Sequence, residues 1–335
     1  MDSVAFLIGH YSIYWSTVIV AFAAAVGVFL FWFFYLWDEP DVVGAFCVVP
    51  LALGLGLVLA RLCHWYFRQD SYRSLQEAMT DYSVGGLALM GAFAGCFLAA
   101  CLAALVRRGR HCGAMLAAMS VAGAGAVSLG RLSGLCNTAD RGGIVAEGSI
   151  WASALVNPST GATEYRLATF LIQALVTAAV FLLLVGLYFW GRKGCRRKDG
   201  DLFWMFCLYY GAAQAVLDST RFDSLYFRSN GFVSVVQILC VAAVVVPLAV
   251  FAVRYRRANG WTPGCLTVLG SCLVLLGLAG WMEYYVQRHG NQAAFAYTVM
   301  GSSLAGVVLL GTVLWVLTRK REIPRSMPTI YPNIT

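Results

Sequence analysis

The stretch LFWMFCLYYGAAQAVLDSTRFDSLYFRSNGF, residues 202–232, combines an apolar first half with regularly spaced polar side chains. Tyr210, Gln214, Asp218 and Arg221 recur at steps of four, four and three residues, which aligns them along one side of a helix. Ionisable groups within a bilayer must face protein or trapped water, so this stripe predicts a functional site near one membrane surface. The alternative is a helix end at which Asp218 and Arg221 simply pair with each other.

The composition is that of an integral membrane protein. Of 335 residues, 60% are hydrophobic and 12% are charged, and the mean hydropathy is +0.73. Soluble domains carry about 25% charged residues, so we predict an all-α polytopic membrane protein. A transmembrane helix needs about 20 apolar residues, which gives about nine predicted spans. They cover residues 11–37, 41–63, 84–106, 112–129, 167–190, 202–217, 231–253, 263–282 and 294–317.

Lysine and arginine are distributed unevenly around these spans. Three follow the third span, five the fifth, three the seventh and four the ninth, so 15 of the 24 follow odd-numbered spans. Because basic residues gather on the cytoplasmic side, we expect the N-terminus outside and the C-terminus in the cytoplasm. The net charge of +8 is then a topology signal that implies no nucleic-acid partner. The first apolar run is too long for a cleavable signal peptide, so we keep it as a span.

Several groups on the predicted outer side are not explained by topology. The segment 131–165 is too long for a simple turn and is predicted to form a folded outer cap. Gly85 and Gly86, at the mouth of the third span, would let a backbone or a ligand approach closely. Arg131 lies at the start of the cap, as Arg221 lies at the end of the polar stripe. Two guanidinium groups at the rim of an apolar chamber suit a phosphate that carries acyl chains.

The cysteines give no sign of a metal site. The chain has 11 of them, mostly within apolar runs, with no CxxC spacing. We interpret them as small core residues and expect neither a bound metal nor a cofactor.

The order of short motifs resembles that of the prolipoprotein diacylglyceryl transferase family over most of residues 13–251. Single motifs are weak, but their order and spacing together are specific. They are Ile13-Tyr14-Trp15, Ala60-Arg61-Leu62, Gly85-Gly86-Leu87-Ala88, Gly91 with Gly95, Gly130-Arg131-Leu132 with Asn137 and Gly142, Tyr209-Tyr210-Gly211, Asp218, Arg221, Asp223-Ser224-Leu225, and Val233-Ser234 with Gln237.

This resemblance implies a fold and a reaction. Residues 1–257 would form a seven-helix membrane core that includes the outer cap at 131–165; residues 258–318 would add two helices, and residues 319–335 a cytoplasmic tail. The enzyme would transfer diacylglyceryl from phosphatidylglycerol to the lipobox cysteine of prolipoprotein signal peptides, at the outer face of the bacterial cytoplasmic membrane. The implied catalytic residues are Arg131, Arg221, Asp218 and Tyr210, and the implied substrate-binding residues are Asn137, Gly85, Gly86, Gly142 and Gln214.

The chain departs from the family pattern at several polar positions. Val84 stands where a His or Gln is usual, Gly134 replaces an Asn and Ala139 replaces a Glu. Gln214 stands in place of an Arg and Gln173 in place of a Glu. Ser16 replaces a Tyr, and the His-Pro expected within residues 167–169 is absent.

These replacements leave a second hypothesis open, a catalytically impaired lipid-binding or lipoprotein-binding protein of the same fold. A small transporter is disfavoured because the ionisable groups gather at one surface and no inverted repeat is visible. For His64 two readings remain: a replacement base that titrates near neutrality, or an interfacial histidine wetted by headgroups.

Overall fold

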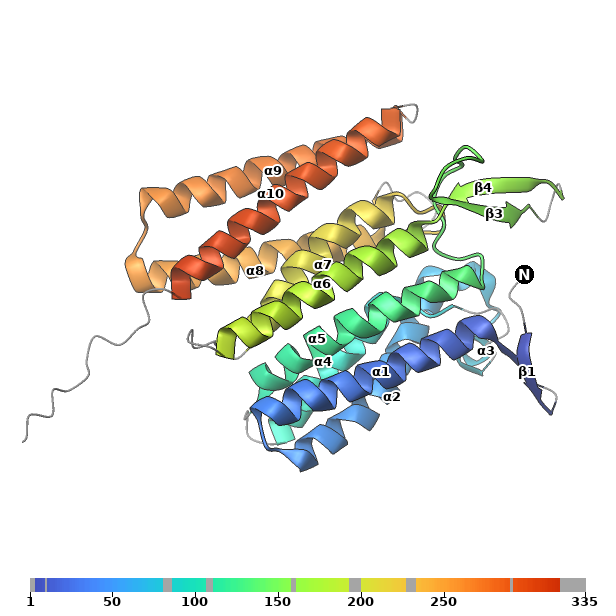
Figure 1. The fold of residues 1–335 in the computed structure, drawn as a ribbon, viewed down its shortest axis with the longest axis horizontal. Coiled ribbons are helices and arrows are strands. Elements are labelled where there is room, and N and C mark those ends of the chain that lie inside the picture. The colour runs from blue at the N-terminus through green and yellow to red at the C-terminus, as the bar shows by residue number, and fades with distance from the viewer. Residues whose placement is uncertain are drawn as a thin grey trace, which may run out of the picture. The chain divides into compact units, whose positions relative to one another are not determined.

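The computed structural model describes residues 4–9, 11–80, 86–106, 111–157, 161–192, 200–226, 233–289 and 292–319 (Figure 1). It forms two compact units, Met1–Val244 and Val245–Thr335, whose boundary falls within helix α8. Within the described ranges, eight helices are long and apolar enough to cross a membrane. The prediction of an all-α polytopic membrane protein is therefore confirmed.

The first unit is a bundle in which α5 is the most enclosed of its candidate spans. α5 packs against α1, α6 and α7, whereas α2 packs mainly against α4. Small residues allow α2 and α4 to pack closely, because a Cβ at Gly95 would lie 2.5 Å from the backbone of Gly56. The helices are α1 (Trp15–Asp38), α2 (Val42–Phe67), α4 (Leu89–Val106), α5 (Cys112–Arg131), α6 (Thr169–Arg192), α7 (Asp201–Ser219) and the first part of α8 (Val235–Asn259).

The helix α7 comes from the stretch with the polar stripe. It is 19 residues long and is not among the eight candidate spans. Tyr210, Gln214 and Asp218 are all buried on it. These side chains therefore face protein, as the spacing predicted for polar groups within a bilayer.

Two predicted spans begin later than the apolar pattern indicates. The first begins at Trp15, because Tyr11–Tyr14 (β2) pairs in an antiparallel hairpin with Val4–Ile8 (β1). The third begins at Leu89. α2, by contrast, continues to Phe67, past the predicted end at residue 63, and is followed by the short helices η1 (Gln69–Ser71) and α3 (Leu75–Thr80).

The segment between α5 and α6, for which an outer cap was predicted, contains secondary structure of its own. It contains the short helix η2 (Leu132–Leu135) and an antiparallel hairpin of β3 (Ala152–Val156) and β4 (Thr163–Leu167). A bridge between Gly142 and Arg221 attaches this segment to the chain that follows α7. In Figure 1 the hairpin and the N-terminal β1 lie toward the same end of the first unit.

The second unit consists of the end of α8 and the hairpin of α9 (Pro263–Arg288) and α10 (Ala293–Arg319), which pack against each other. Gly306 faces the Leu275 side chain at this contact. Residues 320–335 of the predicted tail and most of the basic residues that indicated topology lie outside the described residues.

Candidate active site

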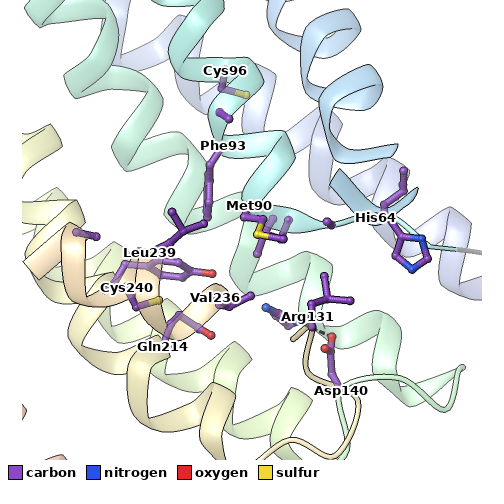
Figure 2. A pocket seen from close by; sticks show the side chains of 18 of the residues that line it. His64, Met90, Phe93, Cys96, Arg131, Asp140, Gln214, Val236, Leu239 and Cys240 are labelled. Carbon is purple, nitrogen blue, oxygen red and sulfur yellow. Dashed lines mark hydrogen bonds and ion pairs between the residues drawn. The ribbon is translucent and has the colours of Figure 1, made fainter. Parts of the chain in front are cut away.

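A cavity of about 780 Å³ lies in the first unit, among α4, α5, α7, the first part of α8, and the segments that follow α2, α5 and α7 (Figure 2). Apolar side chains such as Phe93, Phe206 and Leu239 form much of its wall. A cavity with mostly apolar walls and a few polar groups is typical of a ligand site. Its ionisable and hydrogen-bonding side chains include His64, Arg68, Ser71, Arg131, Asn137, Asp140, Tyr210, Gln214, Arg221 and Asp223.

Arg131 and Arg221 line this one cavity and share a carboxylate. Arg131 Nη1 lies 2.5 Å from Asp140 Oδ2, and Arg221 Nη2 lies 2.6 Å from Asp140 Oδ1. Arg131 ends α5, whereas Arg221 follows α7 by two residues. Asp140 thus holds two guanidinium groups from distant parts of the chain side by side, with one of its oxygens on each.

The backbone at Asp140 is specialised for this bridge. Its φ of 58° is in the left-handed region, which Asp tolerates better than most residues. Its N–H donates to Asp223 Oδ2 at 3.0 Å. Burial favours the neutral acid, but the charges of Arg131 and Arg221 outweigh burial, so the pKa of Asp140 lies below its ordinary value.

Arg221 has two further acidic neighbours. Its Nε donates to Asp223 Oδ1 at 3.0 Å, and its Nη1 lies 3.5 Å from Asp218 Oδ1. Burial would lower the pKa of Arg221, but the carboxylates of Asp140 and Asp223 raise it, so the side chain stays a cation. A simple pair of Arg221 with Asp218 therefore does not describe this side chain. Arg221 makes three ion pairs, and the one with Asp218 is the longest.

Asp218 does not line the cavity but contacts Arg221, which does. It is 1% exposed, and its Oδ2 accepts a hydrogen bond from the Ser234 hydroxyl. The Ser224 hydroxyl donates to its backbone carbonyl at 2.9 Å. These contacts join the end of α7 to the residue that precedes α8 and hold Asp218 within 3.5 Å of Arg221.

The other predicted polar residues line the cavity in different ways. The Tyr210 hydroxyl interacts with the Arg131 guanidinium. Asn137 Oδ1 accepts from the Ala139 N–H at 3.0 Å, so this side chain also stabilises its own turn. Gln214 Oε1 accepts from Gln173 Nε2 at 3.3 Å, and Gln214 Nε2 has no hydrogen-bond partner among the described residues.

The three glycines predicted to approach a ligand differ in position. Gly85 lies outside the described residues. Gly86 has a φ of +91° and lines the cavity, where the His64 ring occupies the space that a Cβ would take. Gly142 does not line the cavity: a Cβ there would lie 2.8 Å from both Thr169 Oγ1 and the Thr220 carbonyl, so it permits close backbone packing.

The predicted site residues did not include Arg68, Asp140 and Asp223, and His64 was raised only as one of two readings; all four line the cavity. Arg68 Nη2 donates to the Asp223 carbonyl at 3.2 Å, across 155 residues of sequence. The available signal was that all four fall on the outer side of the predicted topology. Spacing along one helix could not select them, because each reaches the cavity from a loop or from another helix. Within the described residues, no group of His, Cys, Asp and Glu could hold a metal ion.

The chain is similar to known prolipoprotein diacylglyceryl transferases. The family model described as prolipoprotein diacylglyceryl transferase matches residues 3–253. A phosphatidylglycerol–prolipoprotein diacylglyceryl transferase of Lactococcus lactis subsp. lactis (strain IL1403) is 26% identical over 270 residues, which are 77% of this chain and 97% of that protein. The transferase of the same name from Streptococcus pyogenes serotype M5 (strain Manfredo) is 26% identical over 219 residues, covering 64% and 80% of the two chains. The chain belongs to the prolipoprotein diacylglyceryl transferase family.

Proposed function

We propose that this protein transfers the diacylglyceryl group of phosphatidylglycerol to the lipobox cysteine thiol of prolipoproteins, with Arg131 and Arg221 acting on the lipid phosphate. Family membership supports the reaction class. The observation that carries the site assignment is the pair of guanidinium groups on the wall of one cavity, each within 2.6 Å of the same carboxylate.

The reaction makes two demands on the site. The cysteine sulfur bonds to the glycerol carbon, the bond from that carbon to the phosphate oxygen breaks, and glycerol phosphate leaves with the electron pair. Negative charge therefore grows on the phosphate, where fixed cations are most effective. The acyl chains of the donor need an apolar chamber, and side chains such as Phe93 and Phe206 provide one.

The charge of the cavity wall is compatible with an anionic lipid. Arg68, Arg131 and Arg221 line the wall with two carboxylates, Asp140 and Asp223, so one positive charge is in excess. Arg131 makes a single ion pair, and its Nε has no hydrogen-bond partner among the described residues. A guanidinium has five N–H donors, so we infer that Arg131 contacts phosphate directly while Arg221 holds Asp140 in place and adds its charge.

The geometry predicts that lysine cannot replace either arginine. Arg131→Lys and Arg221→Lys keep the charge but lose the planar fork. A charge-assisted hydrogen bond contributes about 1.5 to 3 kcal/mol, so each change should lower transfer about 10- to 150-fold. The assay uses purified protein in phosphatidylglycerol vesicles with a lipobox peptide, and measures thermal stability in parallel. Transfer by Arg131→Lys at the wild-type rate would remove its phosphate role.

A catalytically impaired binding protein is the second candidate, and one contact favours it. The buried Gln173 and Gln214 form a neutral amide pair where the family pattern has Glu and Arg. The loss of one cation from the chamber would weaken the hold on a developing phosphate charge. In the vesicle assay this candidate predicts saturable binding of phosphatidylglycerol without any thioether product.

The proposed orientation puts the cavity's arginines on the outer side, with the N-terminus outside and the C-terminus in the cytoplasm. The distribution of basic residues supports it. Single cysteines introduced at Asp2 and Ile334 into a cysteine-free protein provide the test. A membrane-impermeant maleimide should label Asp2→Cys in intact cells and Ile334→Cys only after lysis. Labelling of Ile334→Cys in intact cells would reverse the proposed orientation.

A further inference from the structure

His64 lies on the wall of the cavity that holds Arg131 and Arg221. It belongs to the last turn of α2, and in the view of Figure 2 the Arg131 and Asp140 pair lies between Gln214 and His64. Its ring stands over Gly86, whose positive φ and missing Cβ make room for it. The imidazole is therefore held against the cavity wall from two sides, by its own helix and by the segment that leads into α4.

One hydrogen bond fixes the imidazole. His64 Nδ1 lies 3.0 Å from the Tyr72 hydroxyl, and the two rings meet edge to face with centroids 5.8 Å apart. Tyr72 is itself held by the Arg61 guanidinium, 5.1 Å from its ring centroid. Among the residues that the structure describes, this is the only hydrogen bond of the His64 side chain, so Nε2 remains for a ligand. A base whose second nitrogen is oriented by another side chain is the usual arrangement for activating a nucleophile.

The proposed reaction needs such a base. A cysteine thiol with an ordinary pKa of about 8.5 is mostly protonated at neutral pH, and its thiolate is the nucleophile. The other candidates on the wall are committed elsewhere: Asp140 and Asp223 bind arginines, and the Tyr210 hydroxyl interacts with Arg131. Among the described residues that line the cavity, His64 is the one imidazole.

We infer that His64 is the general base that deprotonates the lipobox thiol, an inference that rests on the proposed transferase function. The thiol proton moves to His64 Nε2, while Nδ1–H donates to the Tyr72 oxygen. The sulfur bonds to the glycerol carbon, the carbon–oxygen bond breaks, and the electron pair leaves with glycerol phosphate. The imidazolium then returns its proton to that phosphate. Tyr72 is a positioning residue, since it acts through His64.

The charged and titratable groups near the imidazole come from several parts of the first unit. Arg61 and Arg68 come from α2 and the residue that follows it, and the Tyr72 hydroxyl contacts the ring directly. The charged groups elsewhere on the same cavity wall are Arg131, Asp140, Arg221 and Asp223.

The test compares His64→Gln with wild type over pH 6 to about 9.5, a range that spans the thiol pKa of about 8.5. General-base catalysis contributes about 10²- to 10⁴-fold, so His64→Gln should transfer at least about 100-fold more slowly at pH 7. The deficit should shrink as alkaline pH ionises the thiol. His289→Gln, a change in the second unit, is the matched histidine control and should retain the wild-type profile.

A selenocysteine acceptor peptide separates base catalysis from structure. Its selenol is already ionised at neutral pH, so it should restore most of the rate of His64→Gln. The same peptide should restore most of the rate of Tyr72→Phe. This second variant keeps the imidazole and replaces His64→Gln in the test if that variant does not fold. A uniform loss at every pH with both acceptors, or a wild-type profile in His64→Gln, would overturn the inference. No transfer by wild-type protein would instead contradict the transferase function itself.

Discussion

Asp140 connects the two arginines of the site and therefore determines how they respond to acid. Its pKa is lowered in the folded protein, so its ion pairs stabilise the fold fully above its ordinary pKa of about 4. That stabilisation is lost as the pH falls from there through the lower folded-state pKa. We predict that Asp140→Asn is less stable than wild type at pH 7 and that the difference shrinks toward pH 3. The measurement is thermal unfolding in detergent across this range. A difference that is constant with pH would contradict the pairing.

Some residues of the site could be predicted from the sequence and others could not. Arg131, Tyr210 and Arg221 were selected by the motif order, and all three line the cavity. Asp140 was not among the predicted site residues, and the family pattern has an acid at the neighbouring position, which is Ala139 in this chain. The left-handed backbone at residue 140 and the contact with Asp223, 83 residues later, bring its carboxylate into the site. Neither feature can be read from local spacing.

At the scale of elements, the junction between the cap and the end of α7 positions Arg221. Residues 142 and 221 pair as a bridge, and a Cβ at Gly142 would meet the Thr220 carbonyl at 2.8 Å. We predict that Gly142→Ala separates these two segments, lowers stability by about 1 to 3 kcal/mol and reduces transfer. Gly143→Ala is the matched control, because nothing lies within 4 Å of a Cβ there. Equal stability and activity of the two variants would show that this junction is not tightly packed.

The contact between α6 and α7 carries a second prediction. Gln173 and Gln214 are both buried and joined by a 3.3 Å hydrogen bond, so the two departures from the family pattern compensate for each other. A single buried charge without a partner costs about 3 to 5 kcal/mol. Gln173→Glu and Gln214→Arg should each destabilise the protein, and the double variant should recover much of the loss. The check is a double-mutant cycle of thermal unfolding. Strict additivity of the two changes would mean that the side chains do not interact.

Helix boundaries were predicted less well than helix existence. The apolar pattern placed the start of the first span at residue 11, yet Tyr11–Tyr14 forms a strand. Residues with aromatic and β-branched side chains suit both a membrane helix and a hairpin, and the pairing with Val4–Ile8 decides between them.

For the whole molecule, hydropathy and motif order were sufficient to predict the class and the family, because a bilayer permits few architectures. The division into units was not accessible in the same way. The structure divides into two units at Val244 and Val245, inside α8; the predicted end of the core at residue 257 falls in the same helix and stays a prediction. A helix that continues through a unit boundary gives no change in composition to mark it.

The most direct test of the central claim is complementation of bacteria depleted of their own transferase. We predict that wild-type protein restores growth, and that mass spectrometry finds a diacylglyceryl thioether on the lipobox cysteine of a reporter prolipoprotein. Arg131→Lys, expressed at the same level, should restore little modification. Accumulation of unmodified precursor in cells with abundant, folded wild-type protein would contradict the claim and favour the lipid-binding alternative.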